Sequence, residues 1–214
     1  MCDKTTELLN FHSGKKRQIL KRLKEFRNLL NESEERIFAE LSFCICTPQS
    51  KAMTCWAAIL RLMDNSLLYH GSREEIGAYL KGIRFRNNKA NYIVEARNLF
   101  TKKGQLDIKS KIMACDDSVR LREWLVENVK GVGMKEASHF LRNIGLGEKL
   151  AILDRHIMRN LKDLGVLESI PKSFSEKAYL QIENKMMVYS ESIGISVGEL
   201  DLLLWSKETG FIFK

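Results

Sequence analysis

The segment Val129–Lys135, which reads VKGVGMK, constrains the fold more than any other part of the 214-residue chain. Before it, Asp116-Asp117-Ser118 offers N-cap residues for a helix. After it, apolar residues recur at helical spacing and a C-cap glycine follows: Ala137, Phe140, Leu141, Ile144 and Gly145. The turn Lys130–Gly133 is therefore predicted to join two helices. Its two glycines permit backbone angles closed to other residues and leave the turn's amides bare, which favours binding of one phosphate.

Two chemically active side chains stand near this turn. Lys135 lies one turn into the second helix, and Asp154 follows the apolar triplet Ala151–Leu153. Taken alone, Lys135 can be a solvated or phosphate-contacting lysine, and Asp154 can be an ordinary helix N-cap. Neither residue by itself indicates catalysis.

Their combination is more specific. A glycine hairpin, a lysine two residues later and the sequence Asp154-Arg155-His156 nineteen residues after that lysine resemble the helix-hairpin-helix DNA glycosylase superfamily. In that superfamily such a lysine marks the bifunctional members, which remove a base and also cut the strand. The apolar tail Phe211–Lys214 makes the chain similar to the short second class of 8-oxoguanine DNA glycosylase/AP lyase, which occurs in archaea and some bacteria.

Composition agrees with a polyanionic partner. Thirty-five Lys and Arg against 27 Asp and Glu give a formal net charge of +8. The sequence has neither an apolar run of transmembrane length nor a secretory segment, so we expect no membrane contact and a cytoplasmic, nucleoid-associated protein. An odd number of cysteines, five, favours reduced buried thiols over disulfides.

The predicted fold is all-α. Only two prolines occur, and apolar residues recur mostly at spacings of three and four. A basic helix is predicted over 15–30, and another after Thr47–Ser50 with Met53, Trp56, Ala57, Leu60 and Met63 facing the core. Ser173-Phe174-Ser175-Glu176 predicts the start of a long helix. Because no cysteine follows Cys115, the iron–sulfur loop of endonuclease III-like relatives is excluded.

The resemblance implies two lobes and a division of roles. Residues 32–145 would form a helical barrel that ends in the hairpin, and residues 1–31 with 146–214 the second lobe. Lys135 would attack C1′ of the damaged nucleotide, with Asp154 as its carboxylate partner. A neutral amine is the nucleophile in such chemistry, and a carboxylate stabilises the cationic transition state at the sugar. This chemistry requires no cofactor and no metal.

Recognition residues are carried over in the same way. Phe85 and Trp205 resemble the aromatic pair that sandwiches the extruded base, and Lys214 with its carboxylate resembles the residue that distinguishes 8-oxoguanine from guanine. The remaining residues would contact DNA: Gln49 as the wedge that fills the gap in the duplex, Lys130, Gly131, Val132 and Gly133 in the hairpin, and His156 at a phosphate. Phe85 can instead anchor its helix to the core, and His156 can be an exposed helical residue.

Three functions therefore remain for comparison. The first is excision of 8-oxoguanine followed by β-elimination, acting as a monomer on double-stranded DNA that contains the lesion or an AP site. The second is the same mechanism on oxidised pyrimidines. The third is a non-catalytic helix-hairpin-helix DNA-binding module, for which the pairing of Lys135 with Asp154 has no use.

Overall fold

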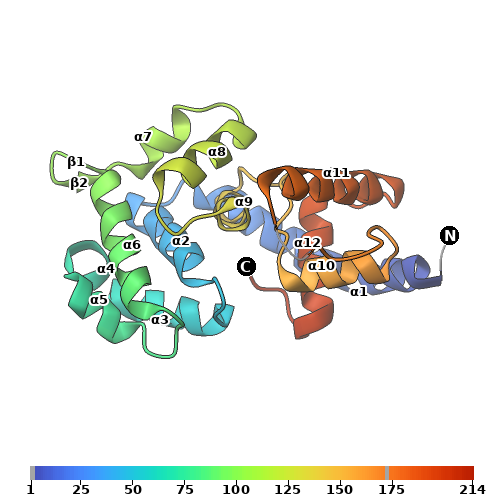
Figure 1. Cartoon of the computed structure of the whole chain (residues 1–214), viewed down its shortest axis with the longest axis horizontal. Helices are drawn as coiled ribbons and strands as arrows, with labels where there is room; N and C mark the ends of the chain where they lie inside the picture. Colours follow the sequence, from blue (N-terminus) through green and yellow to red (C-terminus); the bar gives the residue numbers. More distant parts are fainter. Residues whose placement is uncertain (1–2, 172–173) are drawn as a thin grey trace.

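A computed structural model describes residues 3–171 and 174–214, and it is helical almost throughout (Figure 1). The helices of its first half are α1 Asp3–Leu29, α2 Glu34–Cys46, α3 Ala52–Asp64, α4 Leu67–His70, α5 Arg73–Tyr79 and α6 Arg86–Leu99. A short antiparallel hairpin, β1 Thr101–Lys102 and β2 Gln105–Leu106, separates them from the rest. The helices that follow are α7 Ile108–Met113, α8 Ser118–Asn128, α9 Met134–Asn143, α10 Arg155–Asp163, α11 Glu176–Ser192 and α12 Val197–Thr209. The prediction of an all-α fold is confirmed.

Two hydrophobic clusters form the interior. The first is built from residues between Leu29 and Leu150 and contains α2–α9. The second joins the first helix, from Leu8 to Phe26, to residues Ala151–Leu204. Figure 1 shows helix α9 between these two groups of helices, with α1 passing behind them. The second cluster is therefore assembled from the two ends of the sequence.

The N-terminal helix is longer than predicted. The basic stretch led us to expect a helix over 15–30, but α1 begins at Asp3. Leu8 is buried in the second cluster, and His12 Nε2 lies 3.0 Å from Glu199 Oε2 of α12. Contacts with a segment nearly 190 positions away thus order the first turns, which carry no strong local helix signal.

Helix α3 buries only part of the predicted face, because Trp56 and Met63 pack partly buried against the first cluster but Ala57 is exposed. Met53 and Leu60 are exposed, whereas Cys55, Ala58, Ile59 and Leu62 are fully buried. The fully buried residues stand at positions 55, 58, 59 and 62, so the buried stripe of the helix is shifted by about one position from the predicted one. Helix α11 begins after Ser175, whose Oγ accepts a hydrogen bond from the Ala178 N–H. Ser173, part of the predicted capping box, lies outside the described residues.

The cysteines of the described segments are all free thiols, as predicted: Cys44, Cys46 and Cys55 are buried and Cys115 is partly exposed. Cys2 lies outside the described residues. In the same segments no helix is both long enough and apolar enough to cross a membrane.

Gly145 is a point of close contact between α9 and α1. Its φ of +81° and the hydrogen bonds from Gly145 N to Arg142 O and Leu146 N to Leu141 O end helix α9 in the predicted glycine C-cap. A Cβ at this position would lie 2.6 Å from Arg27 Cα, which is backbone and cannot rotate away. The glycine therefore allows the end of α1 to approach α9.

We predict that Gly145→Ala lowers the free energy of unfolding by at least about 2 kcal/mol, because left-handed strain and a backbone clash add together. Gly165→Ala is the matched control, since φ is +76° there but nothing lies within 4 Å of the added Cβ. Left-handed strain alone should cost that variant about 1 kcal/mol. Urea unfolding of both proteins measures the difference, and equal losses would contradict the close-contact explanation.

Candidate active site

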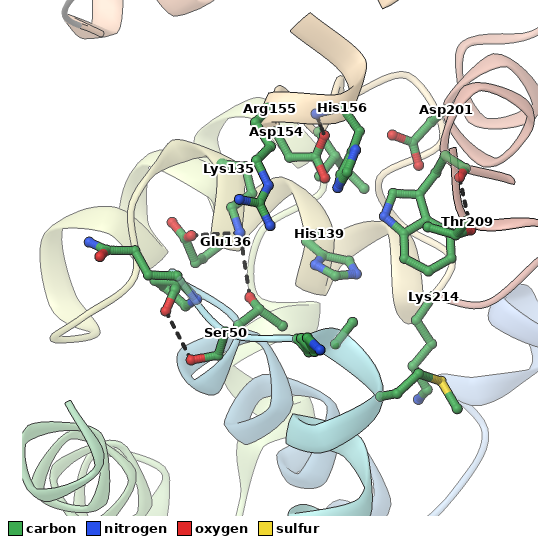
Figure 2. A pocket seen from close by; sticks show the side chains of 18 of the residues that line it. Ser50, Lys135, Glu136, His139, Asp154, Arg155, His156, Asp201, Thr209 and Lys214 are labelled. Carbon is green, nitrogen blue, oxygen red and sulfur yellow. Dashed lines mark hydrogen bonds and ion pairs between the residues drawn. The ribbon is translucent and has the colours of Figure 1, made fainter. Parts of the chain in front are cut away.

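A cavity of about 600 Å³ lies where the two clusters meet. Its lining includes six of the predicted site residues: Gln49, Lys135, Asp154, His156, Trp205 and Lys214. Figure 2 shows Lys135 and Asp154 directed into one space, with Asp201 and Lys214 toward its other end. Residues far apart in the sequence are thus brought to a single site.

Helix α9 positions Lys135. Ala137, Phe140 and Leu141 anchor the helix in the interior, whereas Lys135 in its first turn lines the cavity. Its Nζ lies 2.8 Å from Glu136 Oε1 and 3.4 Å from Thr47 Oγ1. The amine is therefore held between the start of α9 and the loop after α2, at the edge of the open space.

Asp154 stands at the N-terminus of α10. Its Oδ1 accepts hydrogen bonds of 2.8 Å from both the His156 and Ile157 N–H groups, so the residue is a true N-cap. The same side chain lines the cavity. The N-cap and catalytic interpretations are therefore compatible, because the two N–H groups hold the carboxylate through Oδ1 alone and orient it.

The glycine hairpin is only partly as predicted. Gly131 has φ of +82°, and a Cβ there would lie 2.3 Å from Tyr92 Cδ2, so this position requires glycine. Gly133 is extended at φ −103° and needs no special angle. The amides are not all bare either, because Val132 N–H donates to Val129 O and Gly133 N–H donates to the Glu136 carboxylate. The sequence prediction did not include Glu136, in the first turn of α9, as a hydrogen-bond acceptor for an amide of the hairpin.

The loop that carries Gln49 is held by a buried lysine. Lys89 Nζ donates to Cys46 O and Pro48 O, each at 2.7 Å, and to Ser50 Oγ at 3.2 Å. Burial lowers the pKa of Lys89. Gln49 itself is exposed at the cavity with φ of +55°, a conformation that non-glycine residues rarely adopt. Lys89 was missed by sequence reasoning because its partners are backbone carbonyls of a distant loop.

The C-terminal tail folds back onto the first cluster. Lys214 Nζ forms an ion pair with Glu40 and lies 3.4 Å from the centroid of the Trp56 ring. Burial lowers the pKa of Lys214 to about 8, against the opposing effect of Glu40. Phe211 also lines the cavity and meets Trp205 edge-on, with ring centroids 5.4 Å apart. The docked tail was predicted, whereas Phe211 was not singled out.

Phe85 does not join this group. The structure places it at the N-cap of α6, 53% exposed, with φ of +58° and outside the residues that line the cavity. Its ring packs against Arg84, whose guanidinium carbon lies 4.9 Å from the ring centroid. The alternative of a core anchor is wrong, since the side chain is largely in solvent.

Three buried polar residues, Arg142, Asp201 and His139, complete the cavity wall. Arg142 Nη1 donates to Asp201 Oδ2 at 3.0 Å, and burial raises the pKa of Asp201 to about 6, although Arg142 opposes the shift. His139 is buried beside Phe43, and desolvation holds its pKa well below 6.5. Among the described residues no group of three or more His, Cys, Asp or Glu is arranged to hold a metal ion.

Comparison with known proteins identifies the family of this chain. The model of a family described as 8-oxoguanine DNA glycosylase matches residues 19–195. The chain belongs to the 8-oxoguanine DNA glycosylase family. An 8-oxoguanine DNA glycosylase/AP lyase of Fusobacterium nucleatum is 50% identical over 194 residues, which cover 90% of this chain and 89% of that protein.

Solved structures of the 8-oxoguanine DNA glycosylase family show the same fold. The crystal structure of the Thermotoga maritima 8-oxoguanine DNA glycosylase matches with a TM-score of 0.88 at 37% identity, covering 99% of each chain. That of the Methanocaldococcus jannaschii 8-oxoguanine glycosylase/lyase, solved with a 15mer DNA containing 8-oxoguanine, matches with a TM-score of 0.89 at 36% identity. This match covers 98% of the present chain and 99% of the Methanocaldococcus jannaschii chain.

The pKa of Lys214 gives a testable dependence of stability on pH. The folded value near 8 lies below the unfolded value near 10.4, so between these pH values the unfolded chain binds more protons. Raising the pH from 8 to 10 should therefore stabilise the wild type relative to Lys214→Met, by on the order of 1–3 kcal/mol. Urea unfolding of both proteins at several pH values measures this, and a constant difference would contradict the lowered pKa.

Proposed function

We propose that this chain excises 8-oxoguanine from DNA and then cleaves the strand at the resulting AP site. The observation that carries the proposal is the convergence of Lys135 and Asp154 on one cavity in a chain of this family. The relatives named 8-oxoguanine DNA glycosylase/AP lyase support the same substrate and both activities.

Lys135 is the proposed nucleophile. Its neutral amine attacks C1′, the bond from C1′ to N9 breaks, and the base leaves with the bonding electrons and takes up a proton. The sugar ring opens to a Schiff base between Lys135 and C1′. Loss of a proton from C2′ then expels the 3′ phosphate by β-elimination, which cuts the strand. The ion pair with Glu136 places a carboxylate where it can accept a proton from the amine before attack.

Asp154 is the proposed carboxylate partner. Positive charge develops on the sugar as the glycosidic bond breaks, and a fixed anion stabilises that charge more than a mobile one. The two backbone N–H groups of α10 hold the carboxylate without neutralising its charge. This cap therefore provides the preorganisation that the reaction needs.

Trp205 and Lys214 are the proposed base-binding residues. Trp205 and its neighbour Phe211 provide aromatic surface at the cavity, and stacking on such surface offsets the cost of extruding a base, which is a few kcal/mol. Lys214 lines the same cavity, where its polar groups can form hydrogen bonds with the purine. We retain Phe85 as a second proposed base-stacking residue, which would have to move toward the cavity because its ring lies outside it here.

The duplex is proposed to bind across the cavity mouth, between residues 32–145 and the lobe formed by 1–31 with 146–214. Gln49 stands at the mouth as the proposed wedge, and its loop is fixed by Lys89. Phosphates are proposed to contact Lys130, the hairpin Gly131–Gly133 and His156. In the hairpin, a phosphate would replace Glu136 as the ligand of the Gly133 amide. The protein is proposed to act as a monomer, in the cytoplasm with the nucleoid, on DNA carrying the lesion or an AP site.

Borohydride trapping on a duplex with one 8-oxoguanine tests the proposal. The wild type should give a covalent complex, and Lys135→Ala should give none, because reduction captures only the Schiff base. Lys130→Ala is the matched control, since it removes a lysine from the same hairpin and should still be trapped.

Three other results of the trapping experiment would contradict the proposed function. A wild type trapped on AP-site DNA alone would keep the lyase chemistry and reject 8-oxoguanine as the base. Trapping on a duplex with an oxidised pyrimidine instead would support the second function considered above. Binding without trapping on any of these duplexes would support a DNA-binding module.

Deletion of Lys214 separates base recognition from strand cleavage. We predict that the truncated protein loses at least about tenfold in the rate of 8-oxoguanine excision, a cost expected when a buried polar contact to the base is lost. Cleavage of a preformed AP site should change little, because no base is present. Both rates are measured in single-turnover assays, and equal losses would show that Lys214 serves only the fold.

A further inference from the structure

The segment that delivers Asp154 to the cavity lacks regular structure. Residues 151–154 belong to no helix or strand, and Ala151–Leu153 are buried. Buried backbone groups need hydrogen-bond partners, which for such a segment must come from elsewhere. The groups that supply them also decide where Asp154 stands.

Two side chains of α11 hold this segment. Tyr179 Oη donates to Ala151 O at 2.6 Å and accepts a hydrogen bond of 3.3 Å from the Leu153 N–H. Glu183 Oε1 accepts a hydrogen bond of 2.8 Å from the Ala151 N–H. One helix thus fixes both backbone polar groups of Ala151 and the amide next to Asp154.

The same carboxylate connects the segment to the other cluster. Arg122 of α8 donates to both oxygens of Glu183, at 2.7 and 2.9 Å, and its side chain is completely buried. Arg122 Nη1 also donates to Ser138 Oγ at 3.2 Å. Ser138 follows Lys135 by three residues on helix α9, so it lies one turn along the same helix.

From this chain of contacts we infer that Tyr179, Glu183, Arg122 and Ser138 are positioning residues that set the separation of Lys135 from Asp154. None of the four lines the cavity, so none touches the substrate. The network joins the helix of the nucleophile to the segment of the carboxylate by buried, charge-assisted hydrogen bonds, which are short and directional. The inference rests on the proposed function, because it assigns these residues a role in that reaction.

Tyr179→Phe is the test variant. It keeps the ring and removes only the hydroxyl, so the segment before Asp154 loses two hydrogen bonds while the cavity lining is unchanged. We expect the single-turnover rate of 8-oxoguanine excision to fall about 10- to 100-fold, the size of effect that a misplacement near 1 Å produces. Duplex affinity should stay within about threefold, since no group that faces DNA is altered.

A second readout separates positioning from general damage. At a preformed AP site Lys135 reacts with an open aldehyde, and no glycosidic bond has to break, so stabilisation by Asp154 matters less. Schiff-base formation there, measured by borohydride trapping, should fall less than about threefold in Tyr179→Phe. Equal loss of excision and of trapping would overturn the positioning role.

Tyr189→Phe is the matched control. Tyr189 lies on the same helix, and its hydroxyl is 3.2 Å from Thr5 Oγ1, remote from the Asp154 segment. This variant should excise within about twofold of the wild type. If both tyrosine variants lose excision alike, or if Tyr179→Phe retains the wild-type rate, the inference is wrong.

Ser138→Ala provides an independent variant should Tyr179→Phe unfold at the assay temperature. It cuts the network on the side of Lys135 and leaves the ion pair of Arg122 with Glu183 in place. The same pattern is expected, with slower excision and unchanged affinity, and wild-type excision by a folded Ser138→Ala would overturn the inference. A wild type that neither excises nor traps would overturn the proposed function itself, and the inference with it.

Discussion

Burial of helix α9 beyond its first turn is the constraint on which the structure depends. Seven consecutive residues, from Ala137 to Asn143, are buried, and four of them are polar. Each side of the helix therefore needs a specific polar partner as well as apolar contacts. Ser138 meets Arg122 of α8, Arg142 meets Asp201 of α12, and Asn143 donates to Glu40 of α2. These pairs orient α9 relative to both hydrophobic clusters and so fix the direction in which Lys135 points.

The partners of α9 also connect the separate parts of the site. Glu40 accepts a hydrogen bond from Asn143 and forms an ion pair with Lys214. One carboxylate therefore binds both the end of α9 and the C-terminal tail. Asp201 precedes Trp205 by one turn on α12, and its contact with Arg142 holds the aromatic wall against the same helix. Contacts with one buried helix, α9, thus help to position Lys214 and the aromatic residue Trp205 around the cavity that Lys135 lines.

Sequence reasoning succeeded where the signal was local. Gly131, the cap at Asp154 and the glycine end of α9 at Gly145 all depend on a few neighbouring residues, and the structure contains each of them. It failed where the decisive partner is distant. The early start of α1 depends on Glu199, and the loop of Gln49 is held by Lys89. Phe85 was chosen by its residue type at a helix entrance, and type alone does not tell whether a side chain faces a cavity or solvent.

The second hydrophobic cluster has a consequence for how the chain is made. Its residues come from 8–26 and from 151–204, so it cannot close until the segment that contains residues 151–204 has left the ribosome. The first cluster uses residues 29–150 and can assemble earlier. During that interval Leu8, Ile19 and Leu23 of α1 have no apolar surface to cover them. A nascent chain of this protein is therefore expected to expose a hydrophobic helical face until residues 151–204 have emerged, and such a face is the kind of surface that chaperones bind.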